Sequence, residues 1–114
     1  MAPPVIRIWR GATRPIAWRL KTGDGELFDL TGSTFRLSVA AAGVVLIAKD
    51  SEASDGLVID VSQATVTWTP SLVESRLIPL GRLASYELER RIGDDQEIVA
   101  WGQVEGLGGI NADA

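Results

Sequence analysis

The stretch RLASYELERRIGDDQEIVAWGQVE, from Arg82 to Glu105, decides the fold class. Ala84, Tyr86 and Leu88 fall on one face of an extended chain, and the residues between them fall on the other. This is the period-two pattern of a half-buried β-strand. The residues on the second face are Leu83, Ser85, Glu87 and Glu89. A second extended run follows the turn-forming tetrapeptide GDDQ at positions 93–96 and continues to the end of the stretch. The two runs predict a long β-hairpin near the C-terminal end of the chain.

Further strands are predicted upstream of this hairpin, where alternating or β-branched runs are separated by turn residues. They cover residues 5–9, 15–21, 27–30, 34–39, 44–49, 57–60 and 64–69. The buried faces are expected to carry these side chains: Ile16, Trp18 and Leu20; Phe35, Leu37 and Val39; Val66 and Trp68. The run VVLIAK at 44–49 is almost wholly apolar, which is typical of a buried strand.

One short helix is predicted from Ser71 to Leu77. Pro70 precedes it, and Ser71 with Glu74 three residues later has the spacing of a capping box. Leu72, Val73 and Leu77 are expected to form its apolar stripe. About eight short strands and one helical turn predict an all-β sandwich or small barrel.

The chain of 114 residues is expected to form a single domain, residues 1–114. Its core is expected to span about residues 5–106, followed by a glycine-rich tail at 107–114. With no cysteine and no histidine, the chain has no disulfide, cysteine nucleophile, Ser-His-Asp triad or histidine-ligated metal. The net charge of -4 argues against a nucleic-acid partner, which requires a basic face.

No membrane partner is expected, because the most apolar window, residues 39–48, is far shorter than the ~20 residues of a membrane helix. The N-terminus has no basic region followed by an apolar run, so we predict no signal peptide and synthesis in the cytoplasm.

Acidic residues gather in three predicted turns, around Asp24, Asp50 and Asp94. Their spacing does not fit an EF-hand, and turn carboxylates commonly cap their own backbone, so no metal and no cofactor are predicted. A pair of carboxylates could still support glycoside hydrolysis if two acids faced a shared cleft and one had a raised pKa. The favoured prediction is that the protein is not an enzyme.

Four tryptophans, Trp9, Trp18, Trp68 and Trp101, are the heaviest side chains of the chain. Trp18 and Trp68 have apolar neighbours two residues away and are expected in the core. Trp9 and Trp101 are the better candidates for an interface, although core packing is the commoner place for each. An alternative function is a carbohydrate-binding module, in which an exposed ring of Trp9 or Trp101 stacks on a sugar.

The charges are unevenly distributed along the sequence. The arginines form two groups: Arg7, Arg10, Arg14 and Arg19, then Arg76, Arg82, Arg90 and Arg91. One interpretation is self-association, in which a basic end of one copy meets an acidic end of the next. The other is an ordinary solvated surface of mixed charge. On the first interpretation, Arg7 and Arg10 join Trp9 and Trp101 as candidate interface residues.

Several turn motifs resemble a known family. They are Arg10-Gly11-Ala12-Thr13, Asp29 to Thr34 (DLTGST), Asp55-Gly56, the helical segment 71–77, Pro79 to Leu88 (PLGRLASYEL), and Trp101 to Gly106 (WGQVEG). Over about residues 5–106 the chain resembles the small immunoglobulin-like β domains of tailed-bacteriophage and prophage structural proteins, and among them the N-terminal domain of baseplate upper proteins.

This resemblance implies an immunoglobulin-like antiparallel β-sandwich of seven or eight strands. It also implies a non-enzymatic tail or baseplate accessory protein that is located in the virion and assembled in the bacterial cytoplasm. The partners would be other virion proteins and the chain itself, as a cyclic homo-oligomer.

The residues of these motifs also have physical roles of their own. Asp29 is expected to cap the following turn, and Gly32 to permit that turn to be tight. Pro79 and Gly81 are expected to end the helix and start the next strand. Tyr86 is expected to bury its ring. All five are predicted to build the fold.

Overall fold

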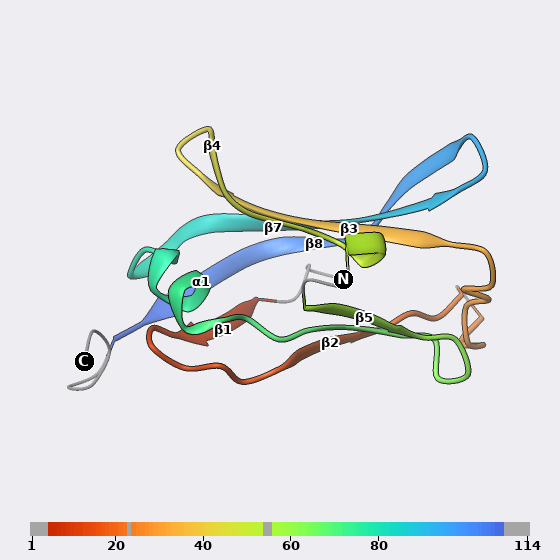
Figure 1. Ribbon diagram of the computed structural model, residues 1–114, viewed down its shortest axis with the longest axis horizontal. Helices are drawn as coiled ribbons and strands as arrows, with labels where there is room; N and C mark the ends of the chain where they lie inside the picture. The colour runs from red at the N-terminus through yellow and green to blue at the C-terminus, as the bar shows by residue number, and fades with distance from the viewer. Residues whose placement is uncertain (1–4, 23, 54–55, 109–114) are drawn as a thin grey trace.

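The protein consists of two β-sheets packed face to face (Figure 1). The structure is a computed structural model and describes residues 5–22, 24–53 and 56–108. The five-stranded sheet has the order β1 (Ile6–Trp9), β8 (Asp95–Leu107), β7 (Gly81–Ile92), β3 (Thr34–Ala41) and β4 (Val44–Asp50). The three-stranded sheet has the order β2 (Ile16–Arg19), β6 (Thr65–Trp68) and β5 (Leu57–Asp60). The prediction of an all-β sandwich with about eight strands is confirmed.

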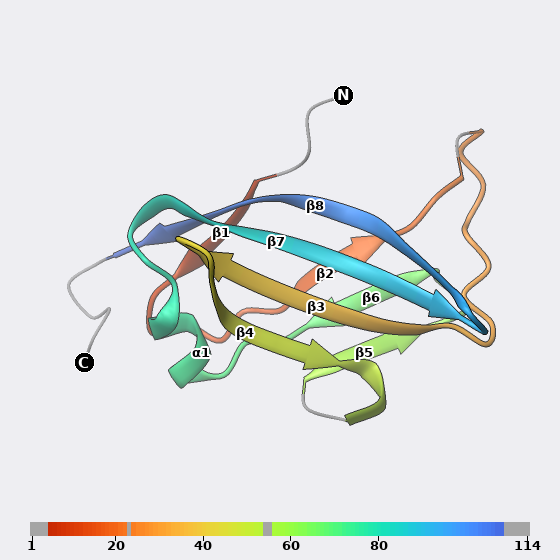
Figure 2. The same ribbon diagram turned by 90° about the horizontal axis from the view of Figure 1, so that it is seen from above.

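The strand order identifies the sandwich as immunoglobulin-like. Such domains place strands B, E and D in one sheet and strands C, F and G, with C′ in some classes, in the other. Here β2-β6-β5 reproduces B-E-D, and β8-β7-β3-β4 reproduces G-F-C-C′. The first strand, β1, adds to the edge of β8 in parallel, whereas the other strand pairs are antiparallel. Figure 2 shows this five-stranded layer from above.

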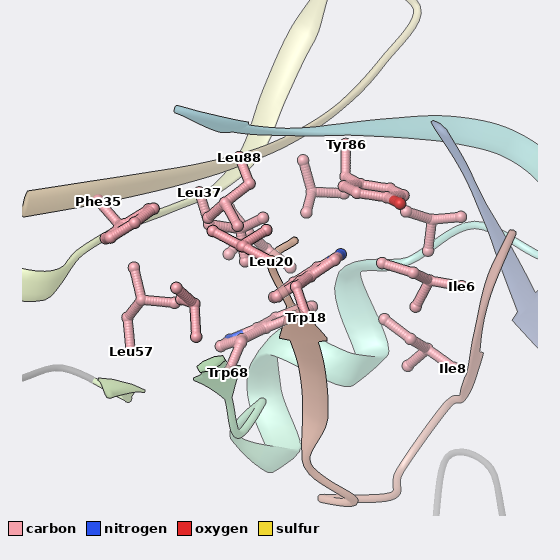
Figure 3. Packing of buried hydrophobic residues seen from close by; sticks show 14 of the residues in the cluster. Ile6, Ile8, Trp18, Leu20, Phe35, Leu37, Leu57, Trp68, Tyr86 and Leu88 are labelled. Atoms are coloured by element: carbon pink, nitrogen blue, oxygen red, sulfur yellow. The ribbon is translucent and has the colours of Figure 1, made fainter. Parts of the chain in front are cut away.

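The core lies between the sheets and follows the predicted alternation (Figure 3). Phe35, Leu37 and Val39 of β3 are buried, as are Tyr86 and Leu88 of β7. Many immunoglobulin domains join strands B and F by a disulfide, which a chain without cysteine cannot form. In its place, the ring of Trp18 on β2 lies 5.7 Å from that of Tyr86 on β7. An aromatic contact therefore connects the two sheets.

Two predicted strands differ from the structure. Residues 27–30 form a loop after a single bridge between Lys21 and Leu27. This loop is held by Arg90, whose guanidinium lies 4.6 Å from the centre of the Phe28 ring and donates to the Asp29 carbonyl at 3.1 Å. The run 44–49 does form β4, but Val44 and Val45 are exposed. The reason is that both residues follow directly on the β3–β4 turn of an edge strand, and Figure 1 shows this turn rising away from the second sheet.

The short helix α1 (Leu72–Leu77) has the predicted capping box, since Ser71 and Glu74 exchange backbone-to-side-chain hydrogen bonds of 2.8 and 3.1 Å. The predicted apolar stripe is wrong. Leu72, Val73 and Leu77 are all exposed. The buried residue of the helix is Ser75, because a hydrogen bond to a neighbouring loop holds that side of the helix against the domain.

The predicted turn residues behave as expected. The Thr31 N–H donates to the Asp29 carboxylate at 3.0 Å, and this bond lowers the pKa of Asp29. Gly32 and Gly81 have φ angles of +74° and +84°, which glycine adopts without steric cost. Pro79 directly follows the C-cap of α1.

The C-terminal hairpin is tighter and longer than predicted. Strands β7 and β8 are joined by Gly93 and Asp94 alone, because Ile92 already pairs with Asp95. β8 extends to Leu107, one residue into the segment predicted as a tail. Positions 109–114 of that tail lie outside the described residues.

Candidate functional site: a groove at the basic end

A groove of about 450 Å³ runs beside β1. Within the described residues β1 pairs with β8 on one side only, so its other edge is open. The groove is mainly apolar, with two arginines among its lining residues: Ile6, Arg7, Ile8, Trp9, Ala12, Arg14, Pro15, Ile16, Pro70 and Leu107. Its volume lies within the ~300–1,000 Å³ of sites that hold small molecules or protein side chains.

Trp9 is the largest side chain of this groove. Its ring is 55% exposed, so the sequence-based preference for a core position is wrong. The reason is its place as the last residue of an edge strand, where no layer covers the outer side. Trp101 is also 55% exposed, but it lies on the outer face of β8, opposite Glu87. It is about 20 Å from Trp9, since the β8 partner of Trp9 is Leu107, six positions further along.

Arg7 belongs to a cluster of three charged side chains. The Glu105 carboxylate accepts hydrogen bonds from Arg7 Nε at 3.2 Å and from Arg82 Nε at 2.9 Å. A β-bulge aligns the cluster, because the two residues between Gly81 and Ala84 lie opposite Glu105 alone. The hydrogen bond from Arg82, followed by that from Arg7, holds the pKa of Glu105 below its usual range. The acid is thus ionised and partly compensates the arginines.

Arg10 and Arg14 differ in their contacts. Arg10 is half-buried and donates to the Arg76 carbonyl of α1 at 3.0 Å, so it joins the loop to the helix. Arg14 lines the groove and is exposed. It makes no ion pair with any residue in the described part of the chain. Arg14 was not among the residues selected from sequence, although it lies in the N-terminal arginine group.

The loop that carries Arg14 is fixed to the helix by Ser75. The Ser75 hydroxyl accepts from the Gly11 N–H at 3.0 Å and donates to the Leu72 carbonyl at 3.0 Å. Both bonds are shielded, since Ser75 is buried. Ser75 therefore fixes the loop with Arg14, which lines the groove, against α1.

Replacing Ser75 by alanine is expected to lower the free energy of unfolding by about 1–3 kcal/mol, because the Gly11 N–H then loses its acceptor in a shielded place. Urea denaturation measures this change. Ser38→Ala, on the outer face of the five-stranded sheet, is the matched control and should change the stability by less than about 0.5 kcal/mol. Equal effects of the two substitutions would contradict the role given to Ser75.

The charges separate along the molecule. Segments 7–15, 71–82 and 105–108 meet at one end (Figure 1), where five arginines outnumber two acids. Those residues are Arg7, Arg10, Arg14, Arg76 and Arg82, with Glu74 and Glu105. Segments 19–22, 24–33, 60–64 and 89–97 meet at the opposite end, where acids predominate. The acids there are Asp24, Glu26, Asp29, Asp60, Glu89, Asp94, Asp95 and Glu97, with Arg19, Lys21, Arg90 and Arg91.

Among the residues that the structure describes, no group of three acids is arranged to hold a metal ion. In the same residues, no helix has the length and apolar character needed to cross a membrane. The resolved carboxyl pKa shifts, at Asp24, Asp29, Asp60, Glu74 and Glu105, are all downward.

The chain was compared with known protein families, curated proteins and solved structures. No protein-family model matches the chain, and no curated protein matches it. Among solved structures, extracellular domains 3–5 of Drosophila OTK are similar, with 15% sequence identity and a TM-score of 0.38. That alignment covers 93% of this chain and 33% of the OTK chain, so this chain spans about a third of that structure.

Proposed function

We propose that this domain acts without catalysis, as a structural protein that assembles with further copies of itself. The observation that carries this proposal is the separation of charge. One end gathers arginines around an apolar groove, and the other gathers acids. Opposite charges on opposite ends favour contacts between copies and discourage contacts between like ends.

The place of this assembly is proposed from the motif resemblance. The turn motifs support a tail or baseplate accessory protein of a phage or prophage, located in the virion and assembled in the bacterial cytoplasm together with other virion proteins. The immunoglobulin-like topology agrees with that resemblance, but many unrelated proteins share it. Genes for tail or capsid proteins on both sides of the coding sequence would support this location. Neighbours of unrelated function would argue against it.

Sedimentation velocity over a wide range of protein concentration tests the assembly itself. We expect the sedimentation coefficient to rise with concentration and to fall when salt is added, because salt screens exposed charges beyond ~10 Å at 0.1 M. A strict monomer at all concentrations in low salt, with no binding to neighbouring gene products, would overturn the proposal.

A carbohydrate-binding module remains the second candidate. It requires an exposed aromatic platform, and the rings of Trp9 and Trp101 are both 55% exposed. Titration of a panel of oligosaccharides, followed by tryptophan fluorescence, tests this function. A sugar that binds the native chain but not Trp9→Ala or Trp101→Ala would support it. The absence of any fluorescence change across the panel would contradict it.

A further inference from the structure

We propose that the tip of the β7–β8 hairpin of one copy docks in the basic groove of the next copy, head to tail. This inference rests on the proposed self-assembly and specifies its contact. The tip comprises Ile92, Gly93, Asp94 and Asp95, and the groove presents Trp9, Arg7 and Arg14.

The hairpin tip projects from the body of the domain in Figure 1, and Figure 2 also places it at the end opposite α1. Asp94 and Asp95 are exposed, and neither makes an ion pair or side-chain hydrogen bond with any residue that the structure describes. Ile92, next to them, is also partly exposed at 38%. The tip therefore offers two available carboxylates beside an apolar side chain.

Three other acids at the same end are already engaged. Thr22 donates to Asp24, the Thr31 N–H donates to Asp29 at 3.0 Å, and the Ser62 hydroxyl donates to Asp60 at 2.8 Å. Because these carboxylates accept bonds within their own turns, they have less capacity to bind a second molecule. Among the described residues of the acidic end, the hairpin tip is distinguished by two adjacent carboxylates, Asp94 and Asp95, that accept no such bond.

The groove complements the tip in charge and in apolarity. Arg14 has no ion-pair partner among the described residues, and Arg7 is exposed while it shares Glu105 with Arg82. The apolar lining of the groove includes Ile8, Pro15, Ile16 and Pro70, together with Trp9. A tip with two carboxylates and one isoleucine can place its acids on the arginines and its apolar side chain against this apolar lining.

The contact has to be between copies, because the hairpin tip and the groove of one copy lie at opposite ends of β8. β8 begins at Asp95 in the tip and ends at Leu107 in the groove lining. Twelve extended residue steps place these points about 40 Å apart, so a tip cannot reach the groove of its own copy. A head-to-tail contact of this kind repeats from copy to copy and produces either a closed ring or a filament.

Charge reversal tests the contact, with sedimentation velocity at low salt as the measurement. We expect Asp94→Lys/Asp95→Lys to weaken self-association about tenfold or more, since close charge pairs at interfaces contribute at least that much. Arg14→Glu should weaken it similarly. Asp24→Lys/Glu26→Lys is the matched control, because it makes the same charge change at the same end but in another loop. It should retain most of the association.

Mixing the two defective variants provides the decisive measurement. The intact tip of Arg14→Glu can dock in the intact groove of Asp94→Lys/Asp95→Lys, so the mixture should form complexes at a lower protein concentration than either variant alone. Circular dichroism of each variant checks that it is folded.

The failure of this contact is distinguishable from the failure of assembly. If the native chain self-associates but Asp94→Lys/Asp95→Lys associates equally well, the hairpin contact is wrong and assembly stands. If Val45→Lys on the exposed β4 edge abolishes association instead, the copies join edge to edge and the hairpin contact is again wrong. A native chain that stays monomeric contradicts both proposals.

Discussion

Trp68→Ala is expected to lower the free energy of unfolding by about 3–5 kcal/mol, the range for removing a buried tryptophan ring. Trp68 is fully buried on β6, the central strand of the three-stranded sheet, and pairs with Ile16 on one side and Leu57 on the other. Loss of the ring leaves a cavity between the sheets that these neighbours cannot fill. Since small domains are stable by about 5–15 kcal/mol, this change removes a large share of the total.

Two further substitutions make the measurement of Trp68→Ala specific. Trp101→Ala removes the same side chain from the exposed outer face of β8 and should change the stability by less than about 0.5 kcal/mol. Trp68→Phe keeps a buried ring and removes an indole N–H that has no hydrogen-bond partner among the described residues. It should therefore cost less than Trp68→Ala. Urea denaturation in which Trp101→Ala costs as much as Trp68→Ala would contradict the burial described for these rings.

Gly106→Ala is expected to destabilise the domain by about 3 kcal/mol, at the upper end of the usual cost of overpacking. A Cβ atom at this position would lie 2.1 Å from the Pro79 carbonyl oxygen and 3.1 Å from Cγ2 of Ile78. The obstacle is backbone, which cannot rotate away as a side chain can. Because the next residue, Leu107, lines the groove, the displacement of β8 should also weaken self-association.

Gly43→Ala is the matched control for Gly106→Ala. Gly43 has a φ angle of +77° and no atom within 4 Å of its added Cβ. Only the backbone conformation opposes alanine there, at a cost of about 1–2 kcal/mol. Thermal or urea denaturation compares the two variants. If Gly106→Ala were the more stable of the two, the close approach of Pro79 to β8 would be wrong.

The local features of this fold were predictable from sequence because they depend on near neighbours. The alternation that buries Phe35, Leu37 and Val39 follows from the strand geometry, whichever strand lies beside it. The capping box of Ser71 and Glu74, and the turn at Asp29, are contacts between residues two or three positions apart. The all-β class follows from adding such local patterns together.

The sequence-based predictions that are wrong concern the solvent exposure of side chains, which local sequence patterns do not specify. Val44 and Val45 look like core residues until β4 is found at a sheet edge. Leu72 and Val73 look like a buried stripe until the hydrogen bond between Ser75 and the Gly11 N–H sets the rotation of the helix. Trp9 is likewise exposed because none of the described strands covers its side of β1. Each outcome depends on which distant element covers a given face.

Local sequence patterns are sufficient to define the strands, the turns and the arginine groups. They do not determine the basic and acidic ends. Arg14 and Arg19 are neighbours in one sequence group, as are Arg82 and Arg90 in the other, yet each pair is divided between the two ends of the domain. β2 follows Arg14 and ends at Arg19, and β7 carries both Arg82 and Arg90, so a strand leads from one member of each pair towards the acidic end. Only the tertiary structure, by bringing distant strand ends together, decides which charges share a surface.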